Sequence, residues 1–260
     1  GYPAWLHGQY LARQTRQQLG LGANPIKSMR ELIEGLGIPV VQLSMLKRIA
    51  GATIAVNRVR GIVANLAGDN SNPKVRRFTL AHELGHLLWD PPAQLRSLRV
   101  DLYDEIEALS ARPEGLDPVE SRANGFAIEL LAPAAEVVEI YGNLGKADEA
   151  VSEVMSKFGI SFTAAQHHVR NSVRNVLGRN LTFSTSVSTK DISPNTWNAV
   201  EDPAYFPIKE TRDSRRGDFA REVVKAEQSN RIHESVAATW LETSVREYQR
   251  KKKDILALGR

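Results

Sequence analysis

The sequence contains no cysteine among its 260 residues, and aromatic residues make up only 7% of it. The missing thiols exclude disulfide bonds, thiolate metal ligands and a cysteine redox switch. The chain also lacks an apolar run approaching the roughly 18 residues of a membrane-spanning helix, and it shows no N-terminal signal pattern. These absences are compatible with the cytosol, so we expect a cytoplasmic protein that makes no membrane contact.

The sequence begins with Gly1 rather than Met, which is typical of a processed or truncated chain. Whether a further domain precedes Gly1 is therefore an open question. Hydrophobic residues make up 42% of the chain, enough to build one large core or two modest ones.

Excess positive charge is confined to the C-terminal part of the chain. Residues 208–260 hold 13 Lys or Arg and 9 Asp or Glu, whereas the remainder holds 21 of each and is neutral. The main part therefore has no overall attraction to nucleic acid. Mixed charge of this kind is typical of solvated helix surfaces, so the run Arg250–Lys253 indicates nucleic-acid binding only weakly.

The most informative stretch is the HExxH pattern from His82 to His86, inside a segment from Pro73 to Trp89 that we predict to be one buried helix. Asn72 or Ser71 can cap this helix. Two His four residues apart project from the same helix face and can bind one Zn²⁺. Glu83 lies beside the metal as a general base. The alternative is a pair of buried, hydrogen-bonded His with no chemical role.

A catalytic zinc site needs a third protein ligand, and Pro92 excludes the metzincin pattern, which has His at that position. A carboxylate from a following helix is the natural supplier. We predict such a helix between Asp117 and Pro133, with Glu120 in its first turn and Asn124 one turn later on the same face. Spacing alone leaves four other acidic residues open as ligands, namely Asp104, Glu105, Glu107 and Glu129.

These two blocks give the sequence a resemblance to a known family. The stretch Arg77–Leu88, followed by Glu120-x-x-Ala-Asn-x-Phe-Ala-x-x-Leu-Leu-x-Pro133, resembles the ImmA/IrrE family of zinc metallopeptidases over roughly residues 10–178. The resemblance implies His82, His86 and Glu120 as zinc ligands, in a His-His-Glu site of gluzincin type, and Glu83 as the catalytic residue. Asp90 and Ala132 depart from the family pattern without touching these ligands.

Coarse patterning predicts an α+β fold, a zincin-like metallopeptidase core with a mainly helical C-terminal extension. We expect helices at 3–20 and from Asn24 to Gly35, then a small sheet with strands at 38–42, 52–56 and 61–65. Residues 95–116 are expected to be a less regular connection, in which residues 101–109 are acidic and partly helical. Helices at 149–158 and 162–176 resemble a helix-turn-helix, and two more are expected at 213–229 and 234–256. We place the peptidase domain at 1–180 and the linker with the helical extension at 181–260.

The resemblance also implies what the protein acts on. Relatives cleave, or relieve repression by, helix-turn-helix transcriptional repressors in stress, mobile-element or phage-response circuits, so we expect a zinc endopeptidase whose protein substrate is such a repressor. The alternative is a non-catalytic regulator with a peptidase fold that binds a repressor or DNA. Three residues stay open as oxyanion stabilisers beyond the metal, namely Arg77, Tyr103 and His167. We interpret Asp90 as an ordinary surface residue, with a hydrogen bond to a ligand imidazole as the weaker hypothesis.

Overall fold

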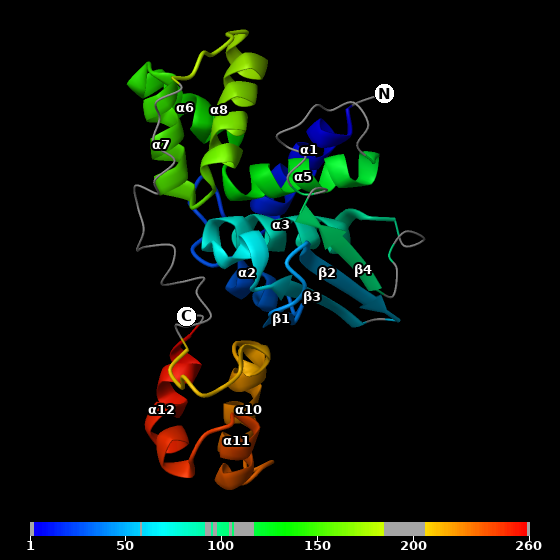
Figure 1. The fold of residues 1–260 in the computed structure, drawn as a ribbon, viewed down its shortest axis with the longest axis vertical. Coiled ribbons are helices and arrows are strands. Elements are labelled where there is room, and N and C mark those ends of the chain that lie inside the picture. Colours follow the sequence, from blue (N-terminus) through cyan, green and yellow to red (C-terminus); the bar gives the residue numbers. More distant parts are fainter. Residues whose placement is uncertain are drawn as a thin grey trace.

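The fold comes from a computed structural model of the chain, which describes residues 3–57, 59–91, 95, 98–103, 106, 117–184 and 206–258. It is a mixed α+β fold with one small sheet and many helices (Figure 1), as the sequence predicted. None of the described helices is long and apolar enough to cross a membrane.

The sheet has four strands in the order β1-β3-β2-β4. Their bounds are Val40–Leu43 for β1, Ile49–Val56 for β2, Val59–Asn65 for β3 and Leu98–Leu102 for β4. β1 pairs in parallel with β3, whereas β2 is antiparallel to both β3 and β4. The β2–β3 turn passes through Asn57, which adopts a positive φ of 55°. The predicted hairpin is therefore confirmed.

β4 is an edge strand that our sequence analysis missed. It lies inside residues 95–116, where we expected an irregular connection, and its residues alternate between apolar and polar. Within the part of the chain that the structure describes, β4 pairs with one strand, β2. A five-residue strand gives too short an alternating pattern to stand out beside an acidic segment, and that pairing with β2 is what defines it.

The helix α3, Pro73–Trp89, has the bounds that the sequence predicted. The Asn72 side chain accepts a hydrogen bond of 2.9 Å from the Lys74 backbone N–H, and Pro73 occupies the first turn. α3 lies along one face of the sheet, and α5 (Pro118–Leu131) and α1 (Ala4–Gln18) lie beyond it on the same side (Figure 1). This layering buries α3 on nearly all sides, which explains why its polar residues are buried too.

The remaining helices of the first core are α2 (Met29–Gly35), α6 (Ala134–Leu144), α7 (Ala147–Phe158) and α8 (Phe162–Leu177), and a short 3₁₀ helix η1 spans Gly68–Ser71. We expected α2 to begin at Asn24, but it begins at Met29, where Ser28 caps it by accepting from Glu31 N–H. α6 was not predicted. One large hydrophobic cluster joins all these helices to the sheet.

Residues 206–258 form a second hydrophobic cluster of their own. It comprises η2 (Asp213–Arg215), α10 (Asp218–Gln228), α11 (Glu234–Trp240) and α12 (Val245–Ala257). We predicted a single helix over 234–256, but Glu242 adopts a positive φ of 56° and Ser244 caps a new helix, so the segment is split. The predicted domain boundary at 180 stays a prediction, since Leu181 and Phe183 still pack against the first cluster.

Candidate metal centre

Two histidines on α3 approach each other closely. Their side chains are fully buried, and the Nε2 atoms of His82 and His86 lie 3.0 Å apart. The rings meet edge to face, with centroids 4.6 Å apart. This geometry follows directly from the spacing of four residues on one helix, as the sequence predicted.

Each imidazole is oriented by a hydrogen bond through its other nitrogen. His82 Nδ1 lies 2.8 Å from Asn124 Oδ1, and His86 Nδ1 lies 2.9 Å from Asp90 Oδ2. With both Nδ1 atoms donating, each Nε2 presents a lone pair toward the other, an arrangement that requires a cation or a proton between them. Burial, aided by the charge of His86, lowers the pKa of His82 to about 3, so this ring is neutral at pH 7.

Asp90 is a buried residue, and our interpretation of it as an ordinary surface carboxylate was wrong. It is 7% exposed and accepts from His86 and also from Arg122 Nη2, at 2.6 Å. Burial alone would raise the pKa of Asp90, but the contacts with His86 and Arg122 lower it below its usual value. Asp90 is therefore ionised at neutral pH and fixes the tautomer of His86, which is the hypothesis that we had ranked second.

Glu120 reaches the histidines from the first turn of α5. The cap of this helix is Asp117, whose side chain accepts from Val119 N–H. Glu120 Oε2 lies 3.2 Å from His82 Nε2 and 3.6 Å from His86 Nε2. Tetrahedral zinc ligands at ordinary bond lengths are about 3.4 Å from one another. The three atoms therefore have the mutual spacing of one metal site, and ligation by Glu120 stays a prediction with which the geometry agrees.

The rival carboxylates do not compete with Glu120 in the described residues. Glu129 is buried on α5, but it accepts from Arg13 Nη1 and from Ala134 N–H, both at 3.3 Å. Asp104, Glu105 and Glu107 lie outside the described residues.

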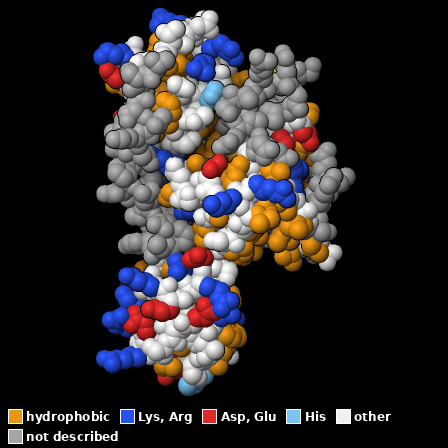
Figure 2. Space-filling view, in the orientation of Figure 1, with side chains coloured by type: hydrophobic (Ala, Val, Ile, Leu, Met, Phe, Trp, Pro, Cys, Tyr) orange, Lys and Arg blue, Asp and Glu red, His pale blue; other side chains and the backbone are white. Residues whose placement is uncertain are grey.

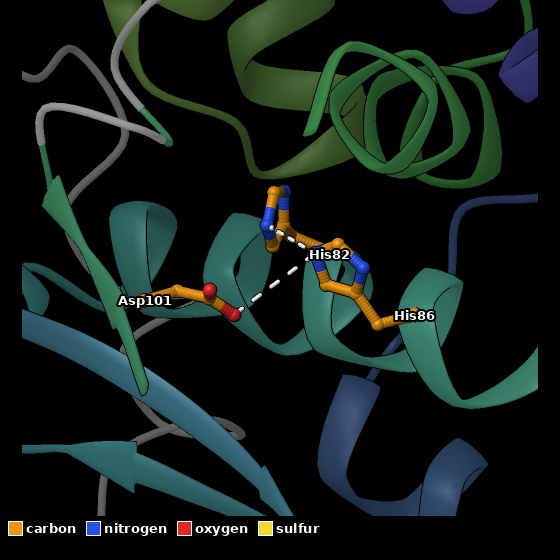
Figure 3. A group of neighbouring side chains, drawn as sticks. All are labelled: His82, His86 and Asp101. Carbon is orange, nitrogen blue, oxygen red and sulfur yellow. Dashed lines mark hydrogen bonds and ion pairs between the residues drawn. The ribbon is translucent and has the colours of Figure 1, made fainter. Parts of the chain in front are cut away.

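Two site residues that the sequence analysis missed come from β4. Arg99 Nη2 contacts Glu120 Oε1, and Arg99 Nε donates to Asp101 Oδ1 at 2.9 Å. Asp101 Oδ2 in turn lies 3.9 Å from His86 Nε2 (Figure 3). His82, His86 and Asp101 thus form a buried group in which one ligand atom from each lies within 4.8 Å of the others. The alternation in Leu98–Leu102 was the available signal, since it places Arg99 and Asp101 on the same face.

Glu83 lies on α3 beside β2, fully buried. Neither carboxylate oxygen has a hydrogen-bond donor among the described residues. Its surroundings include Asp101 and Gly51, where an added Cβ would lie only 2.5 Å from Glu83 Oε1. Burial first, and then the negative charge of Asp101, raise the pKa of Glu83 well above its usual value.

The charges of the site fit a divalent cation. Four buried carboxylates surround the two imidazoles, and two guanidinium groups lie among them: Glu83, Asp90, Asp101 and Glu120 with Arg99 and Arg122. With all four carboxylates ionised, two negative charges would be uncompensated among these largely buried side chains, and the raised pKa of Glu83 reflects that excess. A buried excess of two negative charges, with Nε2 and carboxylate oxygens converging, is the donor set of a divalent metal such as zinc.

Two of the three open candidates for an oxyanion stabiliser have other partners. Arg77 is fully buried and donates to the backbone carbonyls of Ile26 and Lys27, at 2.6 and 2.9 Å. The Tyr103 hydroxyl donates to Ala67 O and accepts from Asn70 N–H, both at 2.9 Å. Both side chains therefore tie the core together, and only His167 stays open.

A fold with a small sheet, an HExxH helix and a following carboxylate helix is that of a zincin-like metallopeptidase. Residues 36–170, just over half of the chain, match the family described as Peptidase M78, the IrrE N-terminal-like domain. The chain belongs to this family, which confirms the resemblance inferred from its motifs. A search of curated proteins found no match. Family membership supports a metallopeptidase-like function, and the buried His-His-Asp group is compatible with a metal site.

Proposed function

We propose that this protein is a zinc-dependent endopeptidase whose metal is held by His82, His86 and Glu120. The observation that carries the proposal is the convergence of three buried atoms, the two Nε2 atoms and Glu120 Oε2, within 3.6 Å of one another. When bound at such a site, zinc lowers the pKa of a coordinated water to about 7 and polarises the scissile carbonyl.

Glu83 is the general base in this proposal. Glu83 follows His82 directly on α3, and its carboxylate receives no hydrogen bond from an N–H or hydroxyl donor among the described residues, so it is available to accept a proton from the attacking water. It then returns that proton to the leaving amine. Asn124 and Asp90 hold the imidazoles in the tautomer that leaves both Nε2 atoms free, and the closed packing around α3 excludes bulk water.

We further propose that the substrate is a helix-turn-helix transcriptional repressor in a stress, mobile-element or phage-response circuit. Support comes from membership of the IrrE N-terminal-like family. The alternative, a non-catalytic regulator that reads DNA through α7 and α8, has less support from the contacts of α8. His168 is buried and donates to Ala132 O, and Arg170 stacks over the Phe183 ring. The buried His168 is therefore not available to contact bases, and the Arg170 guanidinium already has an intramolecular partner.

The test is a comparison of zinc-loaded wild type, Glu83→Gln and Glu120→Ala on a proteome-derived peptide library, with cleavage read by mass spectrometry and zinc by elemental analysis. We expect about one zinc in wild type and in Glu83→Gln, and much less in Glu120→Ala. Glu83→Gln should cut at least about 100-fold more slowly than wild type. Equal cleavage patterns for wild type and Glu83→Gln would contradict the proposal and favour the binding alternative.

A further inference from the structure

Asp101 is an internal carboxylate of the metal centre that the proposed mechanism does not use. It lies on β4 opposite Gly51 of β2, a residue with no side chain to fill the space between them. Its neighbours Leu98 and Val100, which alternate with it along the strand, are 58% and 45% exposed, whereas Asp101 is 1% exposed. The alternation of the strand therefore turns Asp101 toward α3 and away from solvent.

The two oxygens of Asp101 have different surroundings. Oδ1 accepts from Arg99 Nε at 2.9 Å, which fixes the plane of the carboxylate. Oδ2 is buried, receives no hydrogen bond from an N–H or hydroxyl donor among the described residues, and points at the histidine pair, 3.9 Å from His86 Nε2 (Figure 3). The carboxyl group of Glu83 is the other close neighbour of Asp101. A buried carboxylate oxygen without a donor is costly unless a cation compensates it.

We propose that Asp101 is a fourth protein ligand, which occupies the coordination position that a hydrolytic water would need. The inference rests on the proposed function, since it takes His82, His86 and Glu120 as the other three ligands. Structural zinc sites have four protein ligands and are closed, whereas catalytic sites have three and keep one position for water. With Asp101 in place the centre is closed, and its peptidase activity is held back by its own β4.

The position of Asp101 on β4 is suitable for a metal ligand that water can replace. Among the described residues, β4 is an edge strand paired with β2 alone, so less backbone pairing holds it than holds a central strand. Arg99 contacts both Asp101 and Glu120. It therefore links Glu120, which stays on the metal in this proposal, to Asp101, which leaves it. Movement of Asp101 away from the histidines would open the fourth position while the three other ligands keep the ion.

The experiment uses the full chain loaded with Co²⁺, whose visible absorption reports coordination, and acetohydroxamate as a probe of an open position. Wild type is compared with Asp101→Ala and with the isosteric Asp101→Asn, which guards against loss of folding. Glu129→Gln is the matched control, because it also removes a buried carboxylate, but one that contacts Arg13 and Ala134 and none of the metal ligands. Cobalt affinity is measured by competition with a chelator, and hydroxamate affinity by titration of the loaded proteins.

We expect both Asp101 variants to bind Co²⁺ at least about tenfold more weakly than wild type and acetohydroxamate at least about tenfold more tightly. Glu129→Gln should leave both the Co²⁺ affinity and the hydroxamate affinity within about twofold of wild type, because it touches none of the metal ligands. Equal hydroxamate affinity in wild type and Asp101→Asn, or unchanged cobalt affinity, would overturn the proposal. Complete loss of cobalt from folded Asp101→Asn would also overturn it, since Asp101 would then not be exchangeable. If no variant hydrolyses peptides, the peptidase proposal fails, but the two affinities still decide the role of Asp101.

Discussion

At the scale of single residues, the site depends on a missing side chain as much as on those present. Gly51 lies opposite Asp101 in the β2–β4 register, beside Glu83. A Cβ at this position would come within 2.5 Å of Glu83 Oε1 and 3.1 Å of Val63 O. Only glycine leaves room there for the Glu83 carboxylate and for the backbone of β3.

We predict that Gly51→Ala displaces Glu83 and lowers kcat/KM for peptide hydrolysis at least about tenfold, because a general base works only at hydrogen-bond distance from its proton. Zinc content should stay near one per chain, since neither histidine is touched. Elemental analysis and steady-state kinetics on the cleaved peptides measure both. Gly61→Ala on β3 is the control, because its added Cβ meets neighbours only at 3.6 and 3.8 Å. Activity of Gly51→Ala equal to that of Gly61→Ala would contradict this role for Gly51.

At the scale of elements, two glycines let α1 and α5 cross with their backbones in contact. A Cβ on Gly8 would lie 2.0 Å from Arg122 O, and a Cβ on Gly125 would lie 2.1 Å from Trp5 O. The helix α5 also carries Glu120 and Asn124, and both side chains contact His82 on α3. The close crossing of α1 and α5 therefore helps to fix the position of α5, the helix that carries Glu120.

We predict that Gly125→Ala destabilises the protein by about 1–3 kcal/mol, because backbone atoms cannot move away as a flexible side chain can. Urea unfolding monitored by circular dichroism measures the change in the free energy of unfolding. Gly142→Ala on α6 is the control, since an added Cβ there meets nothing within 4 Å. That variant should be stabilised by up to about 1 kcal/mol through helix propensity. Similar stability of the two variants would show that α1 and α5 can separate without cost.

At the scale of the whole molecule, residues 206–258 contact the first core through Glu34 on α2. This buried carboxylate accepts from Arg221 Nη2 at 2.6 Å and from Asp218 N–H at 3.2 Å, both on α10. It also pairs with Arg30 at 3.1 Å on its own helix. Elsewhere on the C-terminal helices, positive and negative side chains are interspersed (Figure 2). Pairs such as Lys252 with Glu227 and Arg250 with Glu247 neutralise much of the excess charge locally, which argues against a strong nucleic-acid surface.

We predict that Glu34→Ala loosens this contact, because it leaves Arg221 and the α10 N-terminus without their buried acceptor. Amide hydrogen exchange should speed up by about tenfold or more at the start of α10 and on α2, with little change in α3. The control is Glu222→Ala, whose partner Lys225 is 55% exposed, so the pair adds little to stability. Exchange rates in α10 that stay equal in the two variants would mean that the hydrophobic contacts alone hold this part in place.

Local patterns determined much of this protein. The bounds of α3, its Asn72 cap and the pairing of His82 with His86 follow from interactions within four or five residues, so the sequence predicts them directly. The β2–β3 hairpin and α5, with Asp117 as its cap, were predictable for the same reason. Family membership was also predictable, because two short motifs, the HExxH stretch and the segment from Glu120 to Pro133, occur in the expected order.

Only the tertiary structure decided the rest of the centre. β4 is too short and too acidic in its surroundings to be recognised alone, and its pairing with β2 is what brings Arg99 and Asp101 to the histidines. The burial of Asp90 likewise depends on Arg122, which is 32 residues away on another helix. Contacts between distant segments leave no periodic trace in the sequence, because they depend on how layers pack and not on how a single helix or strand turns.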